Sequence, residues 1–331
     1  MTLRGQLPSD GGENVVIIKP SSLGDVVHTL PAVRSLKRTF PQLQISWIIN
    51  PELRPLLDGN RDLMRIIPFP RREFGDWLRV PHAIRWLHSL RQIPVDLVLD
   101  FQGLLRSAFM AQMFPRALRF GLADAREGSR WLYHRVASVD PNEHAVDRYL
   151  RLAELAGAKT DPTPDCVLPP GSRIHDLELP SKFVLLHPFA RGSGKSLRPA
   201  EITQLCAALQ PTPVVVVGRA SHKISVPAGC FSVVNQTNLH QLIYLIRQAT
   251  FVVSVDSGPM HLAAAAARGL LSIHFWSDPR KVGPYRPDAW VWKNGKIVRV
   301  SDIPREPAMA ESTRLRPEPE TLGRFVLGQI Q

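Results

Sequence analysis

The stretch NVVIIKPSSLGDVVHTLPAVRSL, residues 14–36, decides the fold because it sets a buried strand directly before a helix. Residues 14–18 form an apolar, β-branched run that is typical of a strand covered on both faces. From Asp25 onward apolar residues recur at helical spacing, which predicts a helix that tolerates Pro31 in its early turns. A strand, a short turn of small residues and a helix form the repeating unit of a parallel α/β sheet.

This alternation continues along the chain and restarts after residue 180. The first series predicts strands over 14–18, 45–49, 65–68, 96–100 and 119–122, and helices from about 25 and over 81–91, 104–113 and 142–156. The second predicts strands over 183–187, 213–217, 232–234, 251–254 and 271–275, and helices over 199–209, 239–248, 259–268 and 320–330. Alternating strands and helices predict a parallel sheet with helices on both faces in each series.

We therefore expect an α/β protein with two Rossmann-like, doubly wound domains that face each other across a cleft. The Pro-rich composition of residues 161–180 predicts a linker. A Gly-rich leader and a Pro-rich, charged tail over 303–319 lie outside the pattern. The expected divisions are a mobile leader over 1–13, an N-terminal domain over 14–160, the linker over 161–180 and a C-terminal domain over 181–331.

Composition restricts the class of protein. The 331 residues include 41 Lys and Arg against 29 Asp and Glu, a formal net charge of +12. The three cysteines are widely spaced, which argues against a disulfide scaffold or a structural zinc site and favours a reducing compartment. No stretch approaches the roughly 18 apolar residues of a membrane span, and the first residues lack the apolar core of a signal peptide. The positive charge suits nucleic acid, an anionic membrane surface or an anionic substrate.

The turn KPSSLGDV, residues 19–26, is the first candidate site. In an open α/β sheet ligands bind beyond the carboxyl ends of the strands, and Gly24 lets a ligand approach the backbone there. Asp25 places a carboxylate in this turn. It is either a first-turn acid that accepts hydrogen bonds from helix amides or a general base, and the sequence leaves both interpretations open.

The stretch VVSVDSGPMHL, residues 252–262, is the second candidate site. A strand again ends in small residues, and Pro259 suits the first helical turn. The amides of Ser257, Gly258 and Met260 would then bind phosphate at the positive end of the helix dipole, with His261 as a further donor. The alternative is an ordinary helix capped by Asp256.

The stretch HPFARGSGKSLRP, residues 187–199, is a Gly-rich turn with Lys195 near its end. It predicts anion binding by Lys195, although a solvated surface lysine is the plain alternative. The GKS segment imitates a Walker A motif, but the first glycine of that motif is missing. A P-loop kinase or NTPase is therefore a weak alternative.

The remaining candidates lie in loops of the first half. Gln102 follows the strand that ends at Asp100, where it either lines the cleft or forms a local turn. Arginines gather in loops, and as a group they predict a surface that receives carboxylates or phosphates. These are Arg71, Arg72, Arg126, Arg130 and Arg135. No HExxH, HxxxH or DxD pattern is present, so we expect neither a metal site nor a cofactor.

The order of these motifs resembles the ADP-heptose:lipopolysaccharide heptosyltransferases of glycosyltransferase family nine, which have the GT-B fold. The similar segments are KPSSLGDVVHTLPA (19–32), DFQGLLRSA (100–108), AREGSRWLYHR (125–135), HAVDR (144–148) and VVSVDSGPMHLAAA (252–265). The internal motifs are closer to heptosyltransferase I, which adds the first heptose, than to the enzyme that adds the second.

The resemblance implies an inverting, metal-independent glycosyltransferase that moves heptose from ADP-heptose to a Kdo or inner-core sugar. Asp25 would be the general base, and Ser22 and Gly24 would shape the reaction centre and contribute to donor binding. Lys195 would hold the leaving diphosphate, Asp256 the heptose, and Ser257, Gly258 and His261 the phosphates. The acceptor, an anionic glycolipid of the Kdo–lipid A type, would meet Arg71, Arg72, Gln102 and Arg126.

Two departures from the family pattern keep alternatives open. The tryptophan of the family's Lys-x-Trp-Pro is absent from Lys195–Pro199, and residues 218–223 carry no acid for a donor ribose. The alternative is a GT-B transferase that uses a UDP-, GDP- or other ADP-sugar on a different glycolipid. A basic nucleic-acid-binding protein is a remote alternative, and the sequence contains no motif of nucleic-acid recognition that favours it. We expect a cytoplasmic protein, peripheral at the inner membrane face, with its positive surface concentrated on the N-terminal domain.

Overall fold

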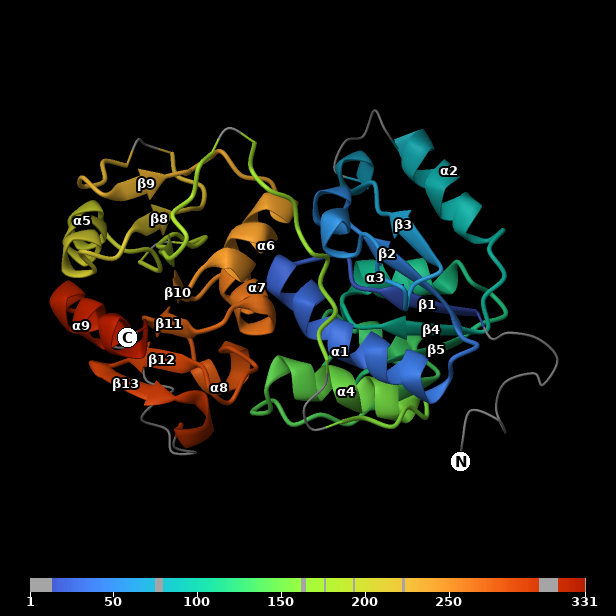
Figure 1. Cartoon of the computed structure of the whole chain (residues 1–331). Coiled ribbons are helices and arrows are strands. Elements are labelled where there is room, and N and C mark those ends of the chain that lie inside the picture. The colour runs from blue at the N-terminus through green and yellow to red at the C-terminus, as the bar shows by residue number, and fades with distance from the viewer. Residues whose placement is uncertain are drawn as a thin grey trace. The chain divides into compact units, whose positions relative to one another are not determined.

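The chain divides into two compact units, Met1–Val167 and Leu168–Gln331. A computed structural model, drawn in Figure 1, describes residues 14–74, 80–161, 165–175, 177–192, 194–221, 224–303 and 315–330. The leader predicted over 1–13 and residues 304–314 of the predicted tail lie outside this part of the chain. The boundary between the units falls within residues 161–180.

The N-terminal unit is built on a parallel sheet with the strand order β3-β2-β1-β4-β5-β6. Its strands are β1 (Asn14–Ile18), β2 (Gln44–Ile49), β3 (Arg65–Pro68), β4 (Leu97–Asp100), β5 (Leu118–Leu122) and β6 (Arg135–Ala137). Its helices are α1 (Leu23–Thr39), α2 (Val80–Leu90), α3 (Leu105–Gln112) and α4 (Ala145–Leu155), with 3-10 helices η2 (Pro51–Leu56), η3 (Arg71–Phe74) and η5 (Ser129–Leu132). The strand order reverses between β1 and β4, as in dinucleotide-binding folds.

The C-terminal unit repeats this arrangement and adds one strand, in the order β13-β12-β11-β10-β7-β8-β9. Its strands are β7 (Val184–His187), β8 (Val214–Val216), β9 (Cys230–Ser232), β10 (Phe251–Val255), β11 (Leu270–His274), β12 (Trp290–Lys293) and β13 (Lys296–Arg299). Its helices are α5 (Pro199–Ala208), α6 (Leu239–Gln248), α7 (Gly258–Ala266), α8 (Pro279–Val282) and α9 (Pro319–Ile330), with 3-10 helix η6 (Val300–Asp302). Here the order reverses between β7 and β10.

Both sheets are covered on both faces, which explains their continuous apolar strands. In the N-terminal unit, Val16 and Ile18 of β1 pack with Met110 and Phe114 beneath α3. Helices α1 and α4 pack together on the other side of the sheet from α3 (Figure 1). In the C-terminal unit, buried apolar side chains of α5 and α9 pack in one hydrophobic cluster with those of β7, β8 and β10. The prediction of two doubly wound α/β units is confirmed.

Several predicted boundaries are wrong, each for a local reason. Helix α1 begins at Leu23 rather than near Asp25, because Ser22 is its N-cap. Helix α4 begins at Ala145, three residues later than predicted, because the His144 ring nitrogen Nδ1 accepts the Val146 amide at 3.1 Å. Pro31 lies inside α1 as predicted.

The hairpin of β12 and β13 was not predicted. The two strands pair antiparallel, and the turn residues Asn294 and Gly295 both have positive φ. An Asn-Gly pair between two short apolar runs is a strong hairpin signal. Strand β6 and helix α8 were also missed, since each has only a few residues.

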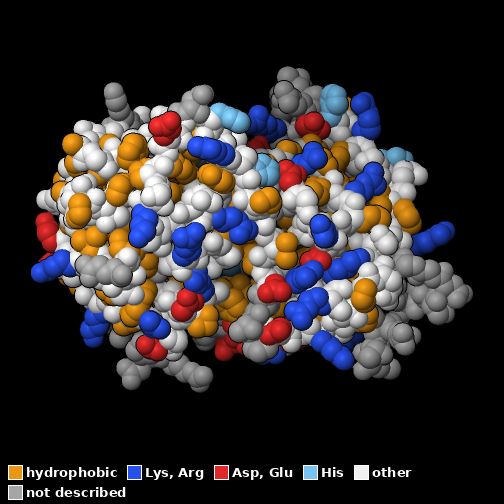
Figure 2. Space-filling model, viewed as in Figure 1, with side chains coloured by type: hydrophobic (Ala, Val, Ile, Leu, Met, Phe, Trp, Pro, Cys, Tyr) orange, Lys and Arg blue, Asp and Glu red, His pale blue; other side chains and the backbone are white. Residues whose placement is uncertain are grey.

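The expected concentration of positive charge on the N-terminal unit is wrong. Residues 1–167 contain 22 Lys and Arg against 18 Asp and Glu, whereas residues 168–331 contain 19 against 11. Figure 2 accordingly shows Lys and Arg side chains over both units. The larger excess of positive charge belongs to the C-terminal unit.

Candidate active site

The candidate site residues of the N-terminal unit follow the carboxyl ends of its strands. Ser22, Gly24 and Asp25 follow β1, Arg71 and Arg72 follow β3, Gln102 follows β4, and Arg126 follows β5. Ligands of open α/β sheets bind at this edge, next to the point where the strand order reverses. The fold therefore places these loops at one edge of one sheet.

Both carboxylate oxygens of Asp25 accept hydrogen bonds from neighbouring residues. Its Oδ2 accepts the Ser22 amide at 3.0 Å and the Ser22 hydroxyl at 2.6 Å. Its Oδ1 accepts the Tyr149 hydroxyl at 3.1 Å, and Lys19 Nζ lies 3.8 Å from the same oxygen. Because Asp25 stands three residues after the N-cap, its bond to the Ser22 amide also stabilises the start of α1.

This environment keeps Asp25 ionised. Burial alone would raise the pKa of its carboxyl group, but the Lys19 charge and the hydrogen bonds from Ser22 and Tyr149 outweigh burial and lower it. The side chain is still 38% exposed. Asp25 is thus an accessible carboxylate at neutral pH, which is the state a general base requires.

Two residues of this site were missed by the sequence analysis. Lys19 is almost fully buried, and its ammonium donates to the Phe101 carbonyl at 2.9 Å and lies 4.8 Å from the centre of the Tyr149 ring. Burial lowers the pKa of Lys19, and the charge of Asp25 opposes that shift. A lysine directly after a fully apolar strand was an available signal for Lys19. Tyr149 comes from α4 and had no local signal.

The candidate acceptor residues are less tightly held than Asp25. Arg71, Arg72 and Arg126 are exposed, and Arg72 lies 3.9 Å from Glu52 in a loose surface pair. The Arg126 amide donates to the Gly103 carbonyl at 2.8 Å, which ties this loop to the end of β4.

Gln102 occupies a local turn. Asp100 Oδ1 accepts the amides of Gln102 and Gly103 at 2.8 and 3.2 Å. The side-chain oxygen Oε1 of Gln102 is buried and has no hydrogen-bond partner among the described residues. Within the part of the chain that the structure describes, the side chain of Asp25 pairs with Ser22, Tyr149 and Lys19 and not with Gln102 or the three arginines. The role of these four residues in acceptor binding stays a prediction.

In the C-terminal unit the structure brings Lys195 and Asp256 together. Lys195 Nζ donates to Asp256 Oδ2 at 3.2 Å, and it lies 4.1 Å from the centre of the Trp276 ring. Trp276 follows β11, and half of its surface is exposed. The ammonium is therefore oriented by a carboxylate and by an aromatic face at the carboxyl edge of this sheet.

The start of α7 differs from the prediction in the residue that caps the helix and in the amides that are available to an anion. Its N-cap is Ser257 rather than Asp256, and the Ser257 hydroxyl donates to the Val255 carbonyl at 3.1 Å. The Met260 amide donates to the Ser257 carbonyl at 3.0 Å, so it is engaged within the turn. The amides of Ser257 and Gly258 therefore remain as the candidate hydrogen-bond donors to a bound anion.

Asp256 is buried among polar side chains. Burial would raise its pKa, but neighbouring His274, a hydrogen bond from Ser277 and the charge of Lys195 lower it. His261 is buried in the first turn of α7 and contributes in the same direction. Burial lowers the pKa of His274 itself to about 4, so its ring is neutral at pH 7.

The loop that carries Lys195 is fastened by Arg316, which the sequence analysis missed. Arg316 lies just before α9, and its guanidinium donates to the Ser196 carbonyl at 2.9 Å and to both carboxylate oxygens of Glu201. Glu201 Oε2 also accepts the Arg198 amide at 2.7 Å, which caps α5. Arg316 further stacks 4.2 Å from the Phe275 ring centre. Arg316 therefore joins the Ser196 carbonyl of this loop to Glu201 of α5 and to Phe275, which follows β11.

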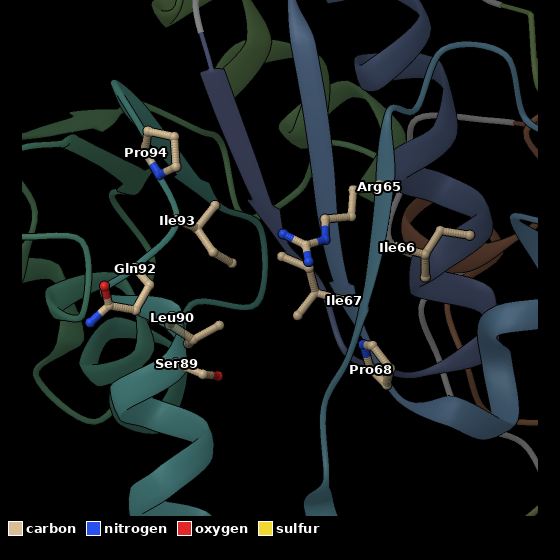
Figure 3. Close-up of a pocket in the computed structure, with 9 residues that line it drawn as sticks. All are labelled: Arg65, Ile66, Ile67, Pro68, Ser89, Leu90, Gln92, Ile93 and Pro94. Carbon is tan, nitrogen blue, oxygen red and sulfur yellow. The ribbon is translucent and has the colours of Figure 1, made fainter.

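A separate pocket of about 370 Å³ lies in the N-terminal unit between β3 and the end of α2. Arg65 and Ile67 point from β3 toward Leu90 and Ile93, whereas Ile66 points to the other side of the strand (Figure 3). None of the predicted site residues lines this pocket. We assign it no part in the candidate site.

Within the part of the chain that the structure describes, no three His, Cys, Asp or Glu side chains gather in a group that could hold a metal ion. Nor does any described helix have the length and apolar character needed to cross a lipid bilayer.

Comparisons with known proteins agree with this arrangement. The family model of glycosyltransferase family 9 (heptosyltransferase) matches residues 83–306. The chain is 26% identical over 336 residues to lipopolysaccharide heptosyltransferase 1 of Pseudomonas aeruginosa, covering 96% of this chain and 92% of that protein. It is also 26% identical to lipopolysaccharide heptosyltransferase 1 of Escherichia coli K12, covering 88% and 94%.

Solved structures share the fold. The E. coli heptosyltransferase WaaC with ADP matches at a TM-score of 0.76 and 21% identity, covering 95% of this chain and 99% of that chain. The E. coli ADP-heptose heptosyltransferase II matches at 0.72 and 22% identity, covering 96% and 98%. The predicted fold class, two Rossmann-like units of the GT-B type, is confirmed.

Proposed function

The chain belongs to glycosyltransferase family 9, the heptosyltransferases, and from this premise we propose that it transfers heptose from ADP-heptose to a Kdo or inner-core sugar of lipopolysaccharide. The resemblance seen in the motifs is thereby confirmed at the level of the family, and the chain is a glycosyltransferase. The relatives named lipopolysaccharide heptosyltransferase 1 support the acceptor. Similar structures with ADP and with ADP-2-deoxy-2-fluoro heptose support the donor.

The observation that carries the proposal is the carboxylate of Asp25. It stands at the carboxyl end of β1, stays partly exposed, and is held ionised by Lys19, Ser22 and Tyr149. The carboxylate has about four acceptor positions, and three are used by the Ser22 and Tyr149 donors. One position remains for the hydroxyl proton of an acceptor sugar.

In the proposed reaction, Asp25 accepts the proton of the acceptor hydroxyl while the hydroxyl oxygen attacks the anomeric carbon of the donor. A new carbon–oxygen bond forms on the face opposite the diphosphate, the bond to the diphosphate breaks, and the configuration inverts. Nucleoside diphosphate leaves with the bonding electron pair. Asp25 thus acts as the general base of a single displacement.

The departing diphosphate gains negative charge, which must be stabilised. We assign this task to Lys195 and to the amides of Ser257 and Gly258 at the positive end of α7. Asp256, which now pairs with Lys195, would contact the heptose, and His261 would support the phosphates. These groups supply the charge that a metal ion supplies in other transferases, so we propose a metal-independent reaction.

The division of labour follows the two units. The N-terminal unit would bind the anionic glycolipid through Arg71, Arg72, Gln102 and Arg126, and the C-terminal unit would bind the nucleotide sugar. We propose a cytoplasmic protein that works at the inner face of the membrane that carries its acceptor. The absence of an acid in residues 218–223 keeps UDP- and GDP-sugars as alternative donors.

The test is transfer by the purified full chain with ADP-heptose and a Kdo–lipid A acceptor. Asp25→Asn should lower kcat by about 10²- to 10⁴-fold, the usual contribution of a general base, while leaving donor affinity unchanged. Asp58→Asn, an exposed carboxylate near Arg54, is the matched control and should keep wild-type kcat. An Asp25→Asn enzyme that turns over at the wild-type rate would remove Asp25 from the mechanism.

A further inference from the structure

Three exposed apolar side chains lie on α3 and the neighbouring η5. Trp131 is 80% exposed, Phe109 55% and Leu105 37%. Leu105 and Phe109 are four residues apart and therefore share one face of α3. Tryptophan is highly buried on average, so this degree of exposure is unusual. We call Leu105, Phe109 and Trp131 the α3–η5 surface.

Three hydrogen bonds show that η5 and the residues before it lie beside α3. The Arg126 amide donates to the Gly103 carbonyl at 2.8 Å, just before α3. Glu127 Oε2 accepts the Leu105 amide at 3.0 Å, in the first turn. Gln112 Nε2 donates to the Leu132 carbonyl at 2.9 Å, in the last turn. The segment 126–132 thus runs alongside α3 in the same direction, which places the backbone of Trp131 beside the last turn of the helix.

The surroundings of the α3–η5 surface are strongly basic. Segments 104–116 and 125–135 contain five arginines, all exposed, and Glu127 is their sole acidic residue. These arginines are Arg106, Arg116, Arg126, Arg130 and Arg135. The Arg130 guanidinium lies 5.0 Å from the centre of the Trp131 ring. An exposed indole beside arginines matches the interface of an anionic bilayer, where aromatic rings lie at headgroup depth and cations meet phosphates.

We propose that the α3–η5 surface docks this protein on an anionic phospholipid bilayer. Trp131, Phe109 and Leu105 enter the headgroup region, and the surrounding arginines contact lipid phosphates. A second copy of the chain fits poorly, because pairing the same surface across a two-fold axis would bring like charges together.

The proposal rests on the proposed function in one respect, since it assumes an acceptor that is carried by a membrane. Helix α3 begins directly after Gln102 and Gly103, at the sheet edge that also carries Asp25. Docking through α3 and η5 therefore brings the proposed acceptor edge toward the bilayer. The sugar of a lipid-borne acceptor then reaches Asp25 without leaving the membrane.

The experiment measures sedimentation of the full chain with vesicles of phosphatidylcholine alone or mixed with phosphatidylglycerol. The wild-type protein should bind the mixed vesicles and not the neutral ones. Both the Trp131→Ser, Phe109→Ser variant and the Arg116→Gln, Arg130→Gln variant should bind about tenfold or more weakly. Two exposed residues elsewhere in the unit give matched controls, Ile84→Ser on α2 and Arg38→Gln on α1, and both should bind as the wild type does.

Insertion has a direct readout in tryptophan fluorescence. Mixed vesicles should shift the wild-type emission to shorter wavelength, and Trp131→Phe should remove that shift although it retains an aromatic ring. The docking proposal is overturned by unchanged vesicle binding in the double variants, by an equal loss in Ile84→Ser, or by self-association that the serine variant abolishes without vesicles.

Two acceptors separate this proposal from the proposed function. The Trp131→Ser, Phe109→Ser variant should transfer heptose to a water-soluble, delipidated Kdo acceptor within about twofold of the wild type. Its transfer to acceptor embedded in vesicles should fall in step with vesicle binding. If the wild-type protein transfers to neither acceptor, the proposed function fails while vesicle binding still decides the docking proposal.

Discussion

Asp25 stabilises the start of α1 and is also the candidate general base. The sequence left open whether it stabilises a helix start or removes a proton, and the structure makes these compatible. Oδ2 is used by Ser22 for the helix, and Oδ1 meets Tyr149 and Lys19. The contacts that fix the first turn of α1 also orient the carboxylate and hold it ionised.

Removal of the Tyr149 hydroxyl should move the acid limb of the pH–rate profile. The pKa of Asp25 is lowered in part by that hydroxyl, so Tyr149→Phe raises it and the base is protonated at a higher pH. Activity of the variant should therefore fall earlier as the pH decreases, while activity at alkaline pH is nearly retained. The measurement is kcat/KM for transfer between pH 4 and 9.

Tyr133→Phe is the control for this experiment, because Tyr133 donates at 2.7 Å to a different buried carboxylate, Asp100. Its acid limb should coincide with that of the wild type. An unshifted limb in Tyr149→Phe would show that Asp25 does not set the pH dependence.

At the scale of elements, the Lys195 loop depends on a contact from α9. Helices α5 and α9 pack together, and Arg316 ahead of α9 binds Glu201 of α5 and the Ser196 carbonyl beside Lys195. The loop between β7 and α5 contains Gly192 and Gly194, and within it the Ser196 hydroxyl accepts the Ala190 amide at 2.9 Å. Arg316 acts as a positioning residue for Lys195.

Arg316→Gln should raise KM for the nucleotide sugar about tenfold and change kcat for the acceptor step much less, because the loop loses orientation but keeps Lys195. Arg316→Lys should recover only part of the loss, since a single ammonium cannot bind both oxygens of Glu201 and the carbonyl together. Arg324→Gln, an exposed residue of α9, is the control. Equal KM values in all three variants would show that the loop is held without Arg316.

Features that depend on a few neighbouring residues could be predicted from the sequence. Contacts between residues far apart in the chain could not. The central strands and most helices follow from apolar periodicity within a few residues, and Asp25, Lys195 and Asp256 follow from the small-residue turns that end strands. Tyr149 lies 124 residues from Asp25, and Arg316 lies 115 residues from Glu201. No local pattern couples such positions. The hairpin of β12 and β13 is different, because the local Asn294-Gly295 pair is enough to predict its turn.

At the scale of the whole molecule, the proposed reaction divides its chemistry between the two units. Each has its own sheet with the strand order of a nucleotide-binding fold, and each places candidate residues where that order reverses. The C-terminal unit has the larger positive excess and the Lys195 site. This distribution suits a nucleotide diphosphate in that unit, whereas the basic α3–η5 surface is a local feature of the other.

Nucleotide binding should stabilise the full chain selectively. We expect ADP to raise the unfolding temperature measured by thermal shift more than UDP or GDP at equal concentration, and to do so equally in EDTA, since a ligand of the native state stabilises by mass action. Lys195→Ala should reduce the ADP shift, and Lys182→Ala, an exposed lysine of the same unit, should leave it intact. A larger shift with UDP or GDP would identify another donor, and a shift lost in EDTA would contradict metal independence.

The contact of Arg316 with the Lys195 loop also bears on the order in which the protein is made. A ribosome completes the N-terminal unit, including the Asp25 turn, about half-way through synthesis, and domains generally fold as units. The C-terminal unit has its first strand at Val184 but receives Arg316 and α9 among its final residues. A nascent chain therefore completes the Asp25 turn well before Arg316 can fasten the loop that carries Lys195, and chains released early lack that contact.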